Sequence, residues 1–123
     1  MSDLTELAGR YIAIWNESDE TRRAAAISGL FTADATYTDP LADVQGHDGI
    51  GAVIAGARDQ FKGFDFKILG EVDANHHIAR FQWELVPAAG GENIVIGFDV
   101  VATDGAGKIK GVYGFLDKVP AGA

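Results

Sequence analysis

The feature that most constrains the fold is a change in hydrophobic period close to residue 64. Before this point, apolar residues recur every three or four positions, a spacing typical of helices with one buried face. After it, apolar and polar residues alternate, as they do in the strands of a sheet. Helices followed by consecutive strands with short turns indicate an α+β fold, in which the helices pack on one face of a mostly antiparallel sheet.

Three helices and five strands are expected. The first helix ends near Asn16, the second starts at Ser18, and the third contains the apolar positions from Ile50 to Phe61. A short strand at residues 35–39 precedes a loop at residues 40–46. The four later strands are expected at residues 64–72, 77–87, 93–103 and 108–118.

Length and charge limit the classes of function. A chain of 123 residues is expected to form a single domain at residues 1–119, with a loose tail at residues 120–123. Ten basic residues among eighteen acidic ones provide no basic face, so neither nucleic acid nor an anionic membrane is an expected partner. The absence of cysteine and of signal-peptide features at the start favours a cytoplasmic location. A small apolar molecule is the expected ligand.

The strand at residues 93–103 predicts a second partner. Its segment IVIGFDVVA is apolar on both faces, which implies that both faces are covered. The helices cover one face, and a second copy of the chain is the simplest cover for the other. We therefore expect a homodimer formed through the outer face of the sheet.

Four segments occur in a distinctive order: RYIAIWN, LFTADATYTDP, GHDGIGAVI and FDVVATDGAGKIKGVYGFLD. Together they resemble the nuclear transport factor 2-like superfamily, particularly its SnoaL-like and ketosteroid-isomerase-like members, and the likeness extends over nearly the whole chain. The resemblance implies a cone-shaped α+β fold. Three N-terminal helices would pack on a curved, mostly antiparallel sheet and enclose a deep apolar pocket.

The same resemblance implies a catalytic set without a cofactor or metal. In ketosteroid isomerases an aspartate moves a proton next to a ketone, while a tyrosine and a neutral aspartic acid stabilise the oxygen that becomes negative. The matching positions here are Asp39 as general base and Tyr11 with Asp99 as oxyanion donors. Gly97 stands where those isomerases have a bulkier residue, which argues against a steroid substrate.

The residues themselves leave alternatives open for these positions. Asp39 precedes Pro40 in an extended segment and shares a face with Tyr37, but it also suits a turn in which it accepts a bond from a backbone N–H two residues later. Asp99 lies in an apolar strand, so it must be hydrogen-bonded, protonated or next to a water-filled cavity. Tyr11 is the obvious partner for it.

Aromatic and histidine side chains are the candidates for ligand contacts. The expected ligand-binding residues are Trp15, Tyr37, Phe61, His77, Trp83 and Phe115. His77 has the same strand parity as Trp83, whereas His76 points to the opposite face, so the pair predicts no metal site. Arg80 should face outward by parity, which disfavours the aspartate–arginine chemistry of limonene-epoxide-hydrolase-like relatives.

Two functions follow from this interpretation. One is an isomerase or cyclase that acts on a small apolar carbonyl compound through Asp39, Tyr11 and Asp99. The alternative is a domain that binds a small ligand, or another copy of itself, without catalysis.

Overall fold

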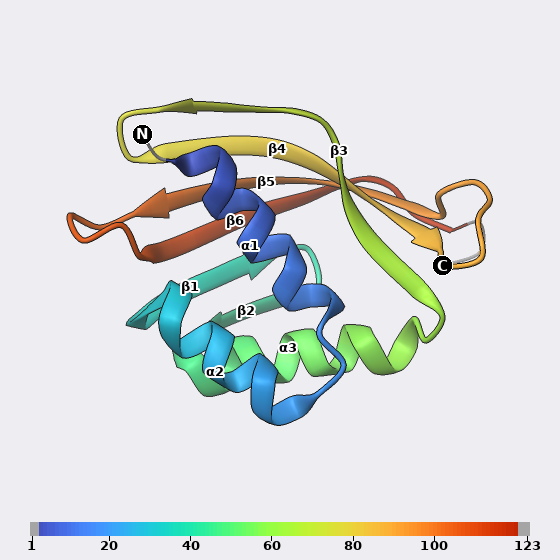
Figure 1. Ribbon diagram of the computed structural model, residues 1–123, viewed down its shortest axis with the longest axis horizontal. Coiled ribbons are helices and arrows are strands. Elements are labelled where there is room, and N and C mark those ends of the chain that lie inside the picture. Colours follow the sequence, from blue (N-terminus) through green and yellow to red (C-terminus); the bar gives the residue numbers. More distant parts are fainter. Residues whose placement is uncertain (1–2, 121–123) are drawn as a thin grey trace.

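The structure is a computed structural model that describes residues 3–120. The helices are α1 (Leu4–Asn16), α2 (Glu20–Leu30) and α3 (Gly46–Gln60). The strands are β1 (Phe31–Asp39), β2 (Ala42–Gln45), β3 (Phe64–Asn75), β4 (Ile78–Pro87), β5 (Val95–Thr103) and β6 (Ile109–Lys118). The predicted α+β class is confirmed, since three helices pack on one curved sheet (Figure 1). Most of the predicted tail lies outside the described residues.

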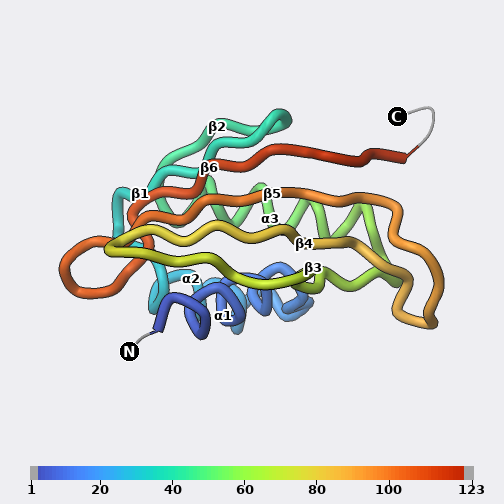
Figure 2. Tube along the Cα trace, turned by 90° about the horizontal axis from the view of Figure 1, so that it is seen from above, coloured from blue at the N-terminus to red at the C-terminus, as the bar shows by residue number. Residues whose placement is uncertain are grey.

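The six strands form one open sheet in the order β2-β1-β6-β5-β4-β3, which can be followed in Figure 2. Strands β3 to β6 form the expected antiparallel meander. Strand β1 pairs in parallel with β6, so that Tyr37 lies beside Val112. The sheet is therefore mixed but mostly antiparallel, and β1 lies next to β6, the last strand.

The predicted loop at residues 40–46 is wrong in part, because it contains strand β2. This strand pairs with the end of β1 in a tight hairpin, with Asp39 opposite Ala42. A strand of four residues carries too few positions for a period of two to be recognised. The hairpin matters for the site, because it sets the position of Asp39.

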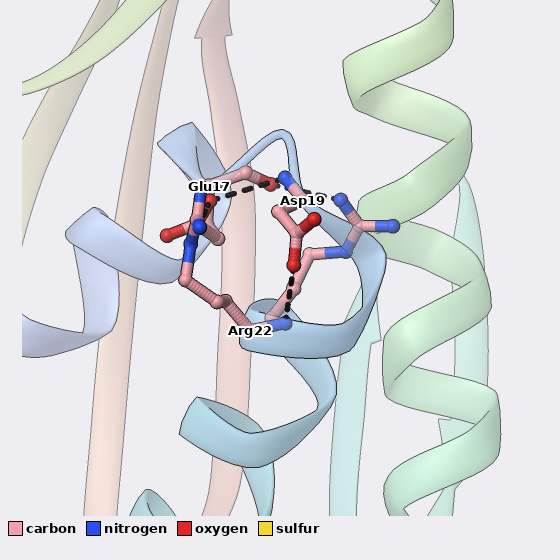
Figure 3. A network of polar contacts seen from close by, with 4 residues as sticks. Glu17, Asp19 and Arg22 are labelled. Carbon is pink, nitrogen blue, oxygen red and sulfur yellow. Dashed lines mark hydrogen bonds and ion pairs between the residues drawn. The ribbon is translucent and has the colours of Figure 1, made fainter.

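The second helix begins one residue later than expected. Its N-cap is Asp19 rather than Ser18, and the Asp19 carboxylate accepts a hydrogen bond of 2.8 Å from the backbone N–H of Arg22. Glu17 accepts hydrogen bonds from Asp19 N at 3.1 Å and from Arg22 Nε at 3.4 Å (Figure 3). This network holds the short connection between α1 and α2.

The curvature of the sheet has a local cause in β3. The pairing of β3 with β4 shifts its register between Leu69 and Asp73, and Gly70 in this interval has a φ of +80°. A bulge with a glycine in the left-handed region bends a strand and increases its twist. Strand β3 accordingly turns across the end of the sheet (Figure 1).

The core lies between α1 and the inner face of the sheet. Helix α1 contacts β3 and β4, while α3 contacts β1 and β2. The Asn16 side chain fixes the end of α1 to β3 with two hydrogen bonds to the Phe66 backbone, one donated at 2.8 Å and one accepted at 2.7 Å. The fully buried side chains with the largest volume include Tyr11, Phe31, Phe81, Ile27, Ile50 and Ile54.

The outer face of the sheet has an exposed apolar stripe over β5 and β6. Phe98 lies opposite Phe115 and Val100 lies opposite Tyr113. Phe115 and Tyr113 are 58% and 47% exposed. Beside the stripe, Arg80 faces outward as predicted and forms an ion pair of 3.0 Å with Asp73. No helix within residues 3–120 is long and apolar enough to span a membrane.

Gly97 explains how Trp83 is accommodated on the inner face. The two residues are paired neighbours on β5 and β4, and a Cβ atom at Gly97 would lie 2.1 Å from the Trp83 ring. The indole therefore lies directly over Gly97, the position at which the isomerase pattern has a bulkier residue.

We predict that Gly97→Ala lowers the free energy of unfolding by about 1–3 kcal/mol, because the rigid ring has to move out of its place. Urea unfolding followed by tryptophan fluorescence measures this change. Gly56→Ala in α3 is the matched control, since a Cβ there meets no atom within 4 Å. In the control, the helix propensity of alanine raises stability by up to about 1 kcal/mol. Equal effects of the two substitutions would contradict the packing argument.

Candidate functional site

Tyr11 and Asp99 form a buried hydrogen bond that joins α1 to β5. The Tyr11 hydroxyl donates to Asp99 Oδ2 at 3.1 Å, across 88 positions of the sequence. Tyr11 is 1% exposed and Asp99 is 4% exposed. The expected partnership of these two residues is confirmed.

The strand period places Asp99 among apolar side chains. Alternate residues of β5 are buried, from Val95 through Gly97 and Asp99 to Val101. Burial raises the pKa of Asp99 from 3.8 to about 7, because the carboxylate loses its hydration. Trp83 and Tyr11 favour the ionised form and oppose this effect, while the negative charge of Asp39 adds to it. A neutral carboxylic acid at this position can donate a hydrogen bond.

Asp39 lies at the end of β1 and combines both roles that the sequence left open. Its Oδ1 accepts hydrogen bonds from the backbone N–H groups of Leu41 and Ala42, both at 2.8 Å. Its Oδ2 accepts a hydrogen bond of 2.5 Å from the Tyr37 hydroxyl. Each carboxylate oxygen has two lone pairs, so one acceptor position remains on Oδ2. Asp39 is thus the turn residue and also faces the same side as Tyr37.

Gly114 separates the two acids. This residue of β6 pairs with Asp99, and a Cβ atom on it would lie 2.8 Å from Asp99 Oδ1 and 3.2 Å from Asp39 Cβ. Any larger residue would push between them. Because Gly114 has no side chain, the partly buried Asp39 and the buried Asp99 can lie close together on either side of it.

The cavity beside Asp99 is small, and neither Tyr11 nor Asp39 is among its lining residues. The cavity has a volume of about 10 Å³, close to the space of one water molecule. Its lining residues are Ile12, Trp15, Tyr37, Phe66, Trp83 and Asp99. The expected deep apolar pocket is therefore not open in this structure, because aromatic rings fill it. Trp15 has ring centroids at 5.7 Å from Tyr37 and 5.4 Å from Phe66.

Trp15 contributes an unused donor to this cavity. Its Nε1 is buried and has no hydrogen-bond partner within residues 3–120. Burial raises the pKa of Tyr11. The nearby Trp15 indole opposes this effect in part, because it favours the ionised phenolate. An unpaired buried N–H costs about 1–3 kcal/mol, so this position favours an oxygen acceptor in the cavity.

Three of the expected ligand residues lie elsewhere. Phe61 packs edge-on against Phe64 after the end of α3, with ring centroids 6.3 Å apart. His77 is exposed in the turn before β4, because the parity that relates it to Trp83 applies only from Ile78 onward. Phe115 lies on the outer face. None of the three lines the cavity, whereas Trp15, Tyr37 and Trp83 do.

Sequence reasoning missed two parts of the site. Ile12 lines the cavity, and its spacing of four residues from the buried Ala8 was a usable signal. Gly114 had no signal, since its role depends on neighbours from two other strands. Within residues 3–120, no group of three or more metal-binding side chains forms. The arrangement is thus one of proton donors and acceptors around a small apolar space.

The raised pKa of Asp99 predicts a pH-dependent stability. The folded chain keeps this proton up to about pH 7, while the unfolded chain loses it near pH 3.8, so the free energy of unfolding falls as pH rises through this window. The full difference is on the order of 4 kcal/mol. Asp99→Asn removes this contribution, and urea unfolding of both proteins at pH 4 to 8 measures it. A constant difference between the two proteins across this range would refute the raised pKa.

Comparison with known proteins agrees with this architecture. The sequence model of a family described as SnoaL-like domain matches residues 8–112. No curated protein matches the chain at a significant level of similarity. A crystal structure from Agrobacterium tumefaciens, provisionally named an isomerase of the SnoaL-like family, is 37% identical. The alignment covers 91% of this chain and 95% of that one, with a TM-score of 0.86.

Two more distant structures share the fold. A SnoaL-like protein of unknown function from Burkholderia thailandensis has a TM-score of 0.72 at 10% identity, with 94% of this chain and 98% of that chain covered. A protein of Sinorhizobium meliloti, provisionally named a polyketide cyclase, has a TM-score of 0.69 at 16% identity, with 89% and 93% covered. The family match over most of the chain and the similarity to the Agrobacterium protein lead to one conclusion: this chain belongs to the SnoaL-like family.

Proposed function

We propose that the chain binds a small apolar carbonyl compound in the cavity beside Asp99 and catalyses the movement of a proton on the carbon next to the carbonyl. The observation that supports this proposal most directly is the buried Tyr11–Asp99 pair, with Asp39 close to Asp99 on the other side of Gly114. The provisional isomerase and cyclase names of two similar proteins agree with this class of reaction.

Asp39 would act as the base. Its Oδ1 is occupied by two backbone N–H groups, so the proton would go to the remaining acceptor position on Oδ2, next to the Tyr37 hydroxyl. The carbon–hydrogen bond of the substrate would break, its electron pair would form an enolate, and Asp39 would return the proton to the same or another carbon. No electron donor or acceptor is needed.

The developing negative oxygen would be stabilised by the neutral Asp99, while Tyr11, whose hydroxyl donates to Asp99 Oδ2, would hold that acid in place. Both are buried, and hydrogen-bond donors in a site without water stabilise charge more than they do in solution. Trp15, which lines the same cavity and has an unpaired Nε1, would be a further donor. Substrate binding would require the aromatic rings of Trp15, Phe66 and Trp83 to move apart, because the cavity volume is only about 10 Å³.

Hydrogen–deuterium exchange tests this reaction without knowledge of the natural substrate. We expect the protein in D₂O to accelerate deuterium uptake next to the carbonyl of cyclohexanone or 2-tetralone, measured by proton NMR. Asp39→Asn keeps an oxygen for the turn but removes the base, so the acceleration should fall by about 100-fold or more. The acceleration should also fall above about pH 7, where Asp99 ionises.

Asp43→Asn is the matched control, because Asp43 lies exposed in the same hairpin and bonds Thr38 at 3.0 Å. It should retain the exchange rate of the original chain. Equal rates for the original chain and Asp39→Asn would rule out Asp39 as the base. Ketone binding without exchange in either protein would contradict catalysis and favour a role in ligand binding alone.

We also propose that the outer face of the sheet pairs with a second copy of the chain. The apolar stripe of Phe98, Val100, Tyr113 and Phe115 runs along two adjacent strands. Polar residues flank it on β4 and β1, such as Gln82 beside Phe98. An apolar centre with polar edges is typical of such interfaces, and two copies related by a twofold axis would bury the same stripe on both sides.

Sedimentation velocity tests the dimer. The original chain should sediment with twice the 13.0 kDa mass of one chain, and Phe115→Lys should raise the dissociation constant by about 100-fold or more, because it buries a charge at the interface. Leu41→Lys, at a position 84% exposed in the β1–β2 turn, makes the same charge change as a control. A monomeric original chain, or equal behaviour of both variants, would contradict the interface.

A further inference from the structure

A second concave region lies outside the core, next to α2 and α3. It has a volume of about 440 Å³, and its charged lining consists of Arg23, Arg58, Lys62 and Asp59. Three bases and one acid are thus gathered here, in a chain that has ten bases and eighteen acids in total. The groove is locally cationic although the formal net charge of the chain is −8.

Arg23 is buried beside this groove with most of its donors unused. The residue is only 6% exposed, and its Nη1 donates to the backbone carbonyl of Glu17 at 2.8 Å. Among residues 3–120 it forms no ion pair with a carboxylate. A guanidinium has five N–H donors and is almost never fully buried unless it is paired.

Arg58 lies near Arg23 on the same groove. Its Nη2 donates to the backbone carbonyl of Phe64 at 2.7 Å, while its Nε is buried and has no partner within the described part of the chain. Burial is the main cause that lowers the pKa of Arg58; Asp65 opposes this effect and the charge of Arg23 adds to it. The two guanidinium groups are therefore close enough to repel each other.

Two arginines with free donors and mutual repulsion form a site for an anion with several oxygen atoms. We propose that this groove binds a small oxyanion of the phosphate class, held between Arg23 and Arg58, with Lys62 at its edge. Guanidinium groups form paired, charge-assisted hydrogen bonds with phosphate oxygens, and the tetrahedral anion can bridge two of them. Lys62 is exposed and paired with Asp59 at 3.4 Å, so it can exchange that partner for the anion.

This site is independent of the proposed carbonyl chemistry. The groove and the core cavity have different lining residues. Arg58 on the groove contacts Phe66 on the cavity, and its guanidinium carbon lies 5.5 Å from the ring centre. Anion binding needs no movement of Asp39, Tyr11 or Asp99. Failure of either proposal therefore leaves the other intact.

Isothermal titration calorimetry with inorganic phosphate at low ionic strength tests the site. We expect saturable binding by the original chain with a dissociation constant below about 10 mM, weaker by about 10-fold or more in Arg58→Met. Arg58→Lys keeps the charge but loses the paired donors, so its affinity should fall between the two. Arg80→Met is the matched control, since Arg80 is an exposed arginine on the outer face.

Several outcomes would overturn the proposal. These are no saturation by phosphate in the original chain, equal weakening in Arg58→Met and Arg80→Met, or the same heat from sodium chloride at matched ionic strength. Acetate, which has a planar carboxylate, should bind more weakly than phosphate; equal or tighter acetate binding would reject the phosphate class. Far-UV circular dichroism confirms that each variant is folded before titration. If Arg58→Met does not fold, Arg58→Lys carries the same comparison.

Discussion

The rest of the structure depends on the burial of one acidic side chain. Asp99 occupies an inward position of β5, between Gly97 and Val101, where a charged carboxylate would be costly. Two responses follow. Tyr11 on α1 provides a hydrogen bond, which ties the first helix to the centre of the sheet. Loss of hydration also raises the pKa of Asp99 to about 7, so the group changes its charge near neutral pH.

Two glycines determine what surrounds this acid. Gly97 leaves room for the Trp83 ring, and Gly114 lets Asp39 and Asp99 face each other without an intervening side chain. The rest of the inner space is filled by rings from α1, β1 and β3. The SnoaL-like fold is therefore present with its central hollow almost closed. The proposed binding of a ligand would therefore require these rings to move.

Membership of the family does not determine chemistry, since one fold serves many functions. What distinguishes this chain is the placement of its charges. Asp99 and Trp15 line the core cavity, while the guanidinium groups of Arg23 and Arg58, each hydrogen-bonded to a backbone carbonyl, border a separate groove beside α2 and α3. The first environment suits an uncharged carbonyl compound and the second suits an anion. The two proposed ligands therefore belong to different chemical classes.

The sequence by itself determined the class of fold, the order of the elements and the shared face of Tyr37 and Asp39, because these follow from local periods of two and of three to four. It also identified the Tyr11–Asp99 pair, through resemblance to a family. The closed cavity, strand β2, the exposed His77 and the cluster of Arg23 with Arg58 were decided only by the tertiary structure. Each depends on which distant segments pack together, and a one-dimensional pattern contains no information on the space left between them.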